Sequence, residues 1–268
     1  MANQIHPTAV IDPSAIIGDG CVFGPYSVVE SDVVIGDGCK LDSFAQIKRY
    51  TTMGANNHVH SYACVGDEPQ DLGFKNEPTM VRIGDNNSIR EHVTIHRGTP
   101  HGEGVTVIGS NCLLMAYSHV AHDCHIGSRV VMANNATLAG HVQVGDHAII
   151  SGLSAVQQFS RIGEYAFLGG MSGFSKDVPP YMLANGIRAR LFGPNTIGLK
   201  RHGFTTETRQ ALKKAYKIIF RTDLVREEAL ETALREVGEF PEVRRLVEFM
   251  RTSRCGVIAD ANKNGNGD

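Results

Sequence analysis

Apolar residues recur at every sixth position over most of the chain. The series runs without a gap from Ile5 to Val65, returns for three units from Ile83, and continues from Ile108 to Phe174. A six-residue period is typical of a parallel β-helix, in which each unit is one short strand plus a turn and the stacked coils share one core. The pattern therefore predicts an all-β coil for this part of the chain.

The positions between these apolar anchors are also regular. A small or β-branched residue stands four positions after each anchor, and four of the six cysteines occupy it: Cys21, Cys39, Cys112 and Cys124. We expect these thiols to point inward and to pack as compact hydrophobes. Glycine often follows the anchor and Asp, Asn or Gly often comes next, which suits a turn in every unit.

The repeat resembles that of the left-handed hexapeptide acyltransferases, in which three units close one triangular coil of about 18 residues. This resemblance implies a left-handed parallel β-helix. Stacked coils lie one strand spacing apart, about 4.8 Å. Residues 18 apart in sequence then become neighbours in space.

Two breaks and a change of period divide the chain. The repeat stops near residues 67–82 and 97–106, where we expect excursion loops, and loops on a rigid scaffold often carry function. After residue 180, apolar spacings of three and four predict helices over 205–221, 224–237 and 241–252. We expect a β-helix over residues 1–190 and a smaller C-terminal α-helical domain over 191–268, ending in a polar, disordered tail from Asn262 to Asp268.

Charge and hydropathy exclude some classes of partner. A formal net charge of -2 argues against nucleic acid as a partner. No apolar stretch approaches the roughly 20 residues that span a membrane, and the first ten residues do not resemble a secretion signal. We therefore expect a cytoplasmic location, in which the cysteines stay reduced.

The densest chemical stretch lies between Ser118 and His125. His122 comes two residues after the anchor Val120, so it should point outward, and the coil period places Gly140 one coil further on and Gln158 two coils on. A histidine base beside an open backbone N–H suits acyl transfer from a thioester, because the N–H can stabilise the oxyanion. Asp123, which stacks under His141, is a candidate for holding the imidazole tautomer.

Cys124 offers a different nucleophile beside a histidine. Its position is the small inward one, so packing is the better interpretation.

Several segments match one family in the right order along the chain. They are Gln70-Asp71-Leu72, Thr94-Ile95-His96-Arg97-Gly98, His119-Val120-Ala121-His122-Asp123, Asn134 to His141, Asp177-Val178-Pro179-Pro180-Tyr181 and Gly198-Leu199-Lys200-Arg201. Together they resemble the UDP-N-acetylglucosamine O-acyltransferase family. The resemblance implies transfer of a 3-hydroxyacyl group from acyl carrier protein to the 3-hydroxyl of UDP-N-acetylglucosamine, the first step of lipid A biosynthesis, by a homotrimer with sites between subunits.

The same resemblance assigns roles to residues and implies neither a metal nor a cofactor. His122 matches the general base and Gly140 the oxyanion N–H, with Asp123 beside the base. The substrate-contacting positions are Asp71, His96, His119, His141, Gln158, Asn195 and Arg201. Gly170 matches the position that limits acyl length, and a glycine there implies a long acyl chain.

Four positions depart from the family pattern. Gln157 stands where a histidine is expected, Gly73 where a lysine is usual, Ile197 in place of glutamate and His202 in place of a second arginine. These changes leave the base intact and leave open whether the acceptor atom is a 3-hydroxyl or a 3-amino group.

Three other functions compete with this one. His119, His122, His125 and His141 could instead bind zinc, as in γ-class carbonic anhydrases that share the repeat. A β-helix that only binds ligands is a third class. The related N-acyltransferases usually carry an extra N-terminal domain, whereas the repeat here begins at Ile5.

Basic residues after the β-helix are candidates for docking an acidic acyl carrier protein, although a solvated helix face would look similar. They are Arg188, Arg190, Lys200, Arg201, Lys213, Lys214 and Lys217.

Overall fold

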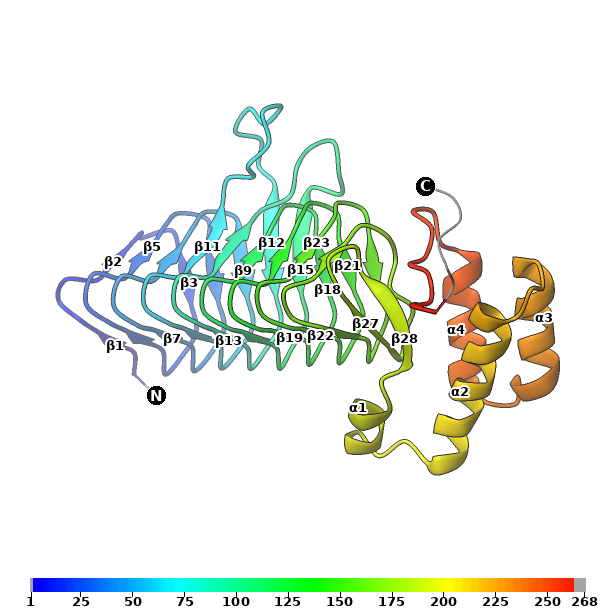
Figure 1. The fold of residues 1–268 in the computed structure, drawn as a ribbon. Helices are drawn as coiled ribbons and strands as arrows, with labels where there is room; N and C mark the ends of the chain where they lie inside the picture. The colour runs from blue at the N-terminus through cyan, green and yellow to red at the C-terminus, as the bar shows by residue number, and fades with distance from the viewer. Residues whose placement is uncertain (1, 263–268) are drawn as a thin grey trace.

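The computed structural model describes residues 2–262 and consists of a long coil of short strands followed by four helices (Figure 1). The strands form three sheets of eleven, nine and eight strands. Up to residue 174 each sheet takes every third strand of the coil, and the last two strands then join the first sheet. The left-handed parallel β-helix with a smaller C-terminal α-helical domain, which the sequence predicts, is confirmed as the fold class.

The strands are short, and most contain two residues. The first sheet contains β1 (Gln4–Ile5), β4 (Val22–Phe23), β7 (Lys40–Leu41), β10 (His58–Val59), β13 (Ser88–Ile89), β16 (Leu113–Leu114), β19 (Val131–Met132), β22 (Ile149–Ile150), β25 (Phe167–Leu168), β27 (Met182–Asn185) and β28 (Arg190–Pro194). The second contains β2 (Val10–Ile11), β5 (Val28–Val29), β8 (Gln46–Ile47), β11 (Cys64–Asp67), β14 (Thr94–His96), β17 (His119–Val120), β20 (Thr137–Leu138), β23 (Ala155–Val156) and β26 (Gly173–Phe174). The third contains β3 (Ile16–Ile17), β6 (Val34–Ile35), β9 (Thr51–Met53), β12 (Met80–Ile83), β15 (Val105–Ile108), β18 (His125–Ile126), β21 (Gln143–Val144) and β24 (Arg161–Ile162).

Neighbouring coils pair in parallel at the expected offset. His119 pairs with Thr137 and Leu113 with Val131, each eighteen positions on. The anchors point inward: Ile47, Val120 and Leu138 are fully buried. The first coil is the exception, since Ile5 is 54% exposed, because no coil stacks beneath it.

The inward cysteines pack as expected. Cys21, Cys39 and Cys124 are fully buried, and Cys112 is nearly so. Burial raises the pKa of the Cys124 thiol to about 12, so this thiol stays protonated and is a poor nucleophile. The structure therefore favours packing over nucleophilic catalysis for Cys124.

The glycines after the anchors have a different role from the one expected. In the unit after Ile35, the residue with positive φ is Gly38, while Gly36 has an ordinary φ. A Cβ at Gly36 would lie 2.7 Å from the backbone of Gly54 in the next coil. Gly36 is thus required by the close approach of stacked coils, and the left-handed turn falls two residues later.

Two excursions leave the coil at the corner between the second and third sheets (Figure 1). The first covers residues 68–79 and the second residues 97–104. Both are shorter than the predicted breaks at 67–82 and 97–106, because β11, β12 and β15 extend into them. Asp67 and residues 80–82 are therefore strand, as are Val105 and Thr106.

The end of the coil and the C-terminal domain contain elements that the sequence did not predict. β27 pairs in parallel with β25 and in antiparallel with β28, so the predicted boundary at residue 190 falls at the start of β28. Helix α1 (Thr196–Arg201) was not expected. The other helices, α2 (Thr206–Arg221), α3 (Arg226–Val237) and α4 (Pro241–Arg251), lie where predicted within one or two residues. The predicted disordered tail falls, after Asn262, outside the described residues.

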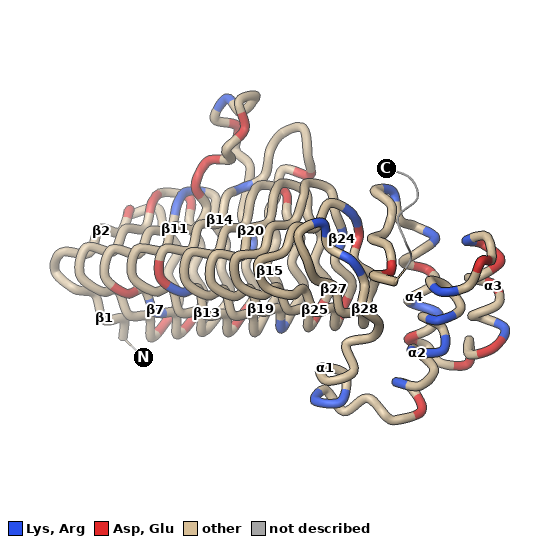
Figure 2. Tube along the Cα trace, viewed as in Figure 1, with Lys and Arg blue, Asp and Glu red and all other residues tan. Residues whose placement is uncertain are grey.

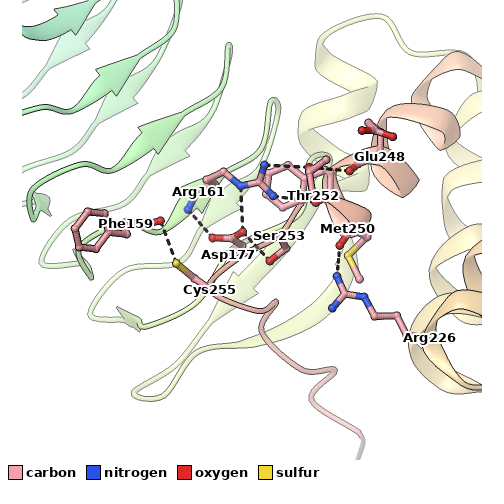
Figure 3. A network of polar contacts seen from close by, with 10 residues as sticks. Phe159, Arg161, Asp177, Arg226, Glu248, Met250, Thr252, Ser253 and Cys255 are labelled. Atoms are coloured by element: carbon pink, nitrogen blue, oxygen red, sulfur yellow. Dashed lines mark hydrogen bonds and ion pairs between the residues drawn. The ribbon is translucent and has the colours of Figure 1, made fainter. Parts of the chain in front are cut away.

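A polar network fixes the helical domain to the last coils (Figure 3). The Arg161 guanidinium donates to Asp177 at 3.1 Å and to the Phe249 carbonyl at 2.9 Å, and Ser253 donates to Asp177 at 2.8 Å. Asp177 is 1% exposed, so its charge is neutralised by Arg161 inside the junction. Among residues 2–262 no helix is long and apolar enough to cross a membrane.

Adjacent residues on β6 provide a test of which side chains form the core. Ile35 is 1% exposed and its neighbour Val34 is 37% exposed. We expect Ile35→Ala to destabilise the protein by about 2–5 kcal/mol through lost burial and a cavity, with a clear fall in Tm by differential scanning calorimetry. Val34→Ala is the matched control and should change Tm far less; equal losses would contradict the inward orientation of Ile35.

Candidate active site

His122 lies on the turn that follows β17, at the corner between the second and third sheets. Its Nδ1 lies 2.9 Å from Asp123 Oδ2, and its side chain is 12% exposed. Asp123 occupies the left-handed turn position with φ of 57°, which brings its carboxylate back beside the imidazole. The two residues form a dyad within one turn.

The Asp123 carboxylate is buried and receives several hydrogen bonds. Thr99 Oγ1 donates to Oδ2 at 2.7 Å and the Thr99 N–H donates at 3.0 Å. Burial alone would raise the pKa of Asp123, but the hydrogen bonds from Thr99 and His122 outweigh burial and hold this pKa below its usual value. An ionised carboxylate only accepts, so His122 Nδ1 carries the proton in the neutral ring and Nε2 keeps its lone pair.

Gly140 lies one coil further on, directly against the imidazole. A Cβ at Gly140 would lie 2.5 Å from His122 Cε1 and 2.7 Å from Nε2, so any side chain there would displace the ring. The backbone N–H of Gly140 has no hydrogen-bond partner within the described part of the chain. His122 and a backbone N–H without a partner therefore lie in contact, as the coil period predicts.

Three further histidines surround the dyad. The ring of His141 lies 5.1 Å from that of His122, and the ring of His96 lies 5.1 Å from that of His119. Burial, with the nearby His96 and His122, lowers the pKa of His119 to about 4, and burial also lowers the pKa of His96 and of His141. These rings are neutral near pH 7 and can act as hydrogen-bond partners without adding charge.

Two of these histidines differ in how well their polar atoms are satisfied. His119 Nδ1 lies 2.7 Å from Thr94 Oγ1. His96 is 7% exposed, and its Nδ1 has no partner among residues 2–262. A buried nitrogen without a partner costs free energy, which makes His96 a strong candidate for a ligand contact.

The remaining predicted residues lie at different distances from this centre. Asp71 is in the first excursion, where its Oδ1 accepts from the Gly73 N–H at 2.6 Å. Gln158 is exposed on the same corner as His122. A cavity of about 680 Å³ adjoins Asp123 and His141 and is also lined by Phe159, Arg161 and Arg254.

Asn195 and Arg201 lie on α1, on the opposite side of the coil stack from the excursions (Figure 1). The Asn195 side chain is 8% exposed; it accepts from Gly198 N–H and donates to the Tyr165 carbonyl, so within this chain it caps α1. Ile197 is 69% exposed. One copy of the chain therefore does not bring these residues to His122.

Thr99 is the site residue that sequence reasoning missed. Its only signal was its position in the second break of the repeat, between Gly98 and Gly102. Both glycines are tightly packed, since a Cβ at Gly102 would lie 2.4 Å from Asp123 Cγ and one at Gly98 2.8 Å from Asp123 Oδ1.

The four histidines proposed as alternative zinc ligands do not all lie close to one another. In the described residues, His122 and His141 group with Asp123, with donor atoms within 4.8 Å of one another, while His119 and His125 are not in that group. His125 pairs instead with Glu103 at 3.2 Å. A second group, Asp42, His58 and His60, lies on the first sheet and its corner, away from this site.

Comparison with known proteins places the chain among acyltransferases. Residues 105–140 match the profile of the bacterial transferase hexapeptide, and residues 177–258 match the second domain of UDP-N-acetylglucosamine O-acyltransferase. An acyl-[acyl-carrier-protein]--UDP-N-acetylglucosamine O-acyltransferase of Thermodesulfovibrio yellowstonii is 50% identical over 255 residues, which cover 95% of this chain and 99% of that protein.

Solved structures of the same family of enzymes have the same fold as this chain. A UDP-N-acetylglucosamine acyltransferase of Francisella novicida aligns with a TM-score of 0.93 at 40% identity, covering 97% of this chain and 95% of that one. The UDP-N-acetylglucosamine O-acyltransferase of Moraxella catarrhalis aligns with a TM-score of 0.92 at 42% identity, covering 95% and 99%. The fold, the ordered motifs and the full-length similarity together show that the chain belongs to the UDP-N-acetylglucosamine O-acyltransferase family.

Proposed function

We propose that this protein transfers a 3-hydroxyacyl group from acyl carrier protein to the 3-hydroxyl of UDP-N-acetylglucosamine, the first step of lipid A biosynthesis, with His122 as general base. The observation that carries the proposal is the His122–Asp123 dyad packed against Gly140. It combines a base of fixed tautomer with an open backbone donor on the neighbouring coil.

The geometry supports a direct transfer. His122 Nε2 takes the proton of the sugar 3-hydroxyl while that oxygen attacks the thioester carbonyl carbon, and the Gly140 N–H stabilises the resulting oxyanion. The tetrahedral intermediate collapses by breaking the carbon–sulfur bond, and the imidazolium returns the proton to the departing thiolate. Asp123 stabilises the imidazolium throughout without itself becoming protonated.

Acceptor binding falls to the groups around this dyad. Asp71, His96, His119, His141 and Gln158 lie on the same corner or in its excursions, and the buried Nδ1 of His96 still lacks a partner in residues 2–262. A hydroxyl or phosphate oxygen of the nucleotide sugar would satisfy such a nitrogen. Asn195 and Arg201 would reach the acceptor from a second copy of the chain.

A homotrimer is the assembly that we propose. One corner of the coil carries a row of stacked rings: Tyr26, Phe44, Tyr62, His92 and Tyr117. Tyr26, Tyr62 and Tyr117 are each more than half exposed, and a long exposed aromatic row favours contact with another protein surface. The cytoplasmic location expected from the sequence stays a prediction.

The main alternative is that the acceptor atom is a 3-amino nitrogen instead of a 3-hydroxyl oxygen. His202, which replaces an arginine of the family pattern, packs its ring on His147 and Tyr165 of its own chain at 4.9 and 5.2 Å. Its ring therefore packs within its own chain. A 3-amino sugar nucleotide would use the same base, so both acceptors belong in the first assay.

The general base is tested by His122→Ala. We expect wild-type protein to transfer from a 3-hydroxyacyl carrier protein to UDP-N-acetylglucosamine, and the variant to lose roughly 100-fold or more in kcat/KM, the contribution of a general base. His125→Ala is the matched control and should keep near wild-type rates, because His125 lies on the next strand and pairs with the exposed Glu103 at 3.2 Å. Equal losses in both variants would argue against His122 as the base. Transfer by wild type to the 3-amino sugar alone would show that the acceptor is an amine.

Acyl length is tested at Gly170. This glycine is exposed, and a Cβ there would meet only the Gly152 carbonyl at 3.3 Å and Ser151 at 3.8 Å, so a side chain would project into open space. We expect wild type to prefer long 3-hydroxyacyl donors and Gly170→Met to shift the preference to shorter ones. Competition between carrier-protein thioesters of graded length measures this; an unchanged preference would exclude Gly170 as the limit.

The donor surface is tested on α2. Lys213 and Lys217 are exposed and border a cavity of about 200 Å³ with Phe192 and Arg221, and basic residues gather on this helix (Figure 2). Reversing both charges to Glu should raise the donor KM about tenfold and leave the acceptor KM unchanged. Lys214→Glu is the control, because Lys214 already pairs with Glu236 at 3.0 Å. An unchanged donor KM in the double variant would remove this surface from consideration.

A further inference from the structure

The second excursion, residues 97–104, closes over the carboxylate of Asp123. Gly98 and Gly102 allow this, because a Cβ at either position would lie under 3 Å from the carboxyl group. Asp123 is 4% exposed and Thr99 is 1% exposed. The loop backbone therefore shields this carboxylate from water.

Thr99 directs two donor groups, its hydroxyl and its backbone N–H, at this carboxylate. Its hydroxyl donates to Oδ2 at 2.7 Å, and its N–H donates to Oδ2 at 3.0 Å and to Oδ1 at 3.2 Å. Oδ2 is also the atom that accepts from His122 Nδ1 at 2.9 Å. Thr99 and His122 thus share one oxygen, and the position of that oxygen sets the direction of the imidazole.

The excursion is itself held in place at both ends. Arg97 is 3% exposed; it donates to the Gly66 carbonyl at 3.3 Å, pairs with Glu68 at 3.4 Å and lies 5.2 Å from the Phe74 ring centre. At the other end, Thr106 Oγ1 accepts from the Asp123 N–H at 2.9 Å. The first excursion therefore supports the second, and the second supports Asp123.

We propose that the second excursion positions the catalytic carboxylate and that Thr99 is its positioning residue. The inference rests on the proposed role of His122 as general base. The Thr99 hydroxyl fixes Oδ2 in line with Nδ1 and disperses part of its negative charge. Without this hydroxyl, the carboxylate turns more freely and concentrates its charge on the imidazolium, which then gives up its proton less readily.

Replacement of Thr99 by valine tests this directly, since valine keeps the shape and the N–H but removes the hydroxyl. We expect Thr99→Val to lower kcat about tenfold, the effect of one hydrogen bond to a charged group, and to leave the acceptor KM within about twofold. The acidic limb of the kcat–pH profile should move to higher pH, because the imidazolium persists to higher pH. Thr99→Ser, which restores a hydroxyl, should recover both the rate and the profile.

Thr79→Val is the matched control. Thr79 is a threonine with 6% exposure at the end of the first excursion, next to Gly104, and its hydroxyl has no partner within residues 2–262. It should behave as wild type. A Thr99→Val protein with an unshifted profile and normal kcat would overturn the proposal, as would a Thr99→Ser protein as impaired as Thr99→Val. If valine prevents folding, judged by Tm, Thr99→Ala provides the same comparison.

A readout without turnover separates this inference from the proposed function. The ¹³Cε1 resonance of His122, assigned with His122→Gln, can be titrated by NMR in wild type, Thr99→Val and Thr79→Val. A higher titration midpoint in Thr99→Val alone supports the coupling even if no acyl transfer is found, in which case only the proposed function fails. Equal midpoints in the three proteins would reject the coupling.

Discussion

The parallel register between coils is the constraint on which the rest of the structure depends. Each coil pairs with the next position by position, as in His119 with Thr137, so every residue lies beside its own counterparts about 4.8 Å away. The residue type at each position must therefore pack against the residues at the same position in the coils above and below. Apolar anchors fill the interior, glycines such as Gly36 stand where backbones approach closely, and flat rings such as Phe44 and Tyr62 stack outside at 5.0 Å. The six-residue pattern in the sequence is the direct consequence of this requirement.

At the corner that carries His122, stacked positions hold different residues: a histidine on one coil and a glycine on the next. His122 occupies a position whose counterpart on the next coil has no side chain, and the ring fills that space. The buried imidazoles nearby add polar groups without charge, because burial lowers the pKa of His96, His119 and His141. Asp123 alone remains ionised beside the base, since hydrogen bonds from Thr99 and His122 outweigh the effect of burial. The neighbouring imidazoles thus add no competing cation to the pair of His122 and Asp123 at neutral pH.

Much of this arrangement could be predicted from the sequence, because periodicity converts sequence distance into spatial distance. The period of six indicated a parallel β-helix and the inward cysteines. The resemblance to the hexapeptide acyltransferases implied the left hand and the coil of about 18 residues, and this coil length predicted the contact of His122 with Gly140. Thr99 could not be predicted, because residues 97–104 have no period and their path depends on Arg97, Phe74 and the close packing of Gly102. Helix α1 and the β27–β28 hairpin were missed for a related reason: both are short, and their hydrogen bonds to the last coil, such as Asn195 to Tyr165, decide their form.

The excursions and α1 carry different groups of the proposed site, at different places along the chain. Cys64 pairs with Thr94 and Thr94 with His119, so both excursions return to the register that they left and the coil stays rigid across them. That register keeps the turn of His122 in place, and the second excursion then holds the Asp123 carboxylate beside it through Thr99. The His122–Asp123 dyad lies within one chain, whereas α1 lies across the stack from it. If Asn195 and Arg201 bind the acceptor from a second copy, as we propose, assembly is a condition for specificity, while the dyad is a property of the single coil.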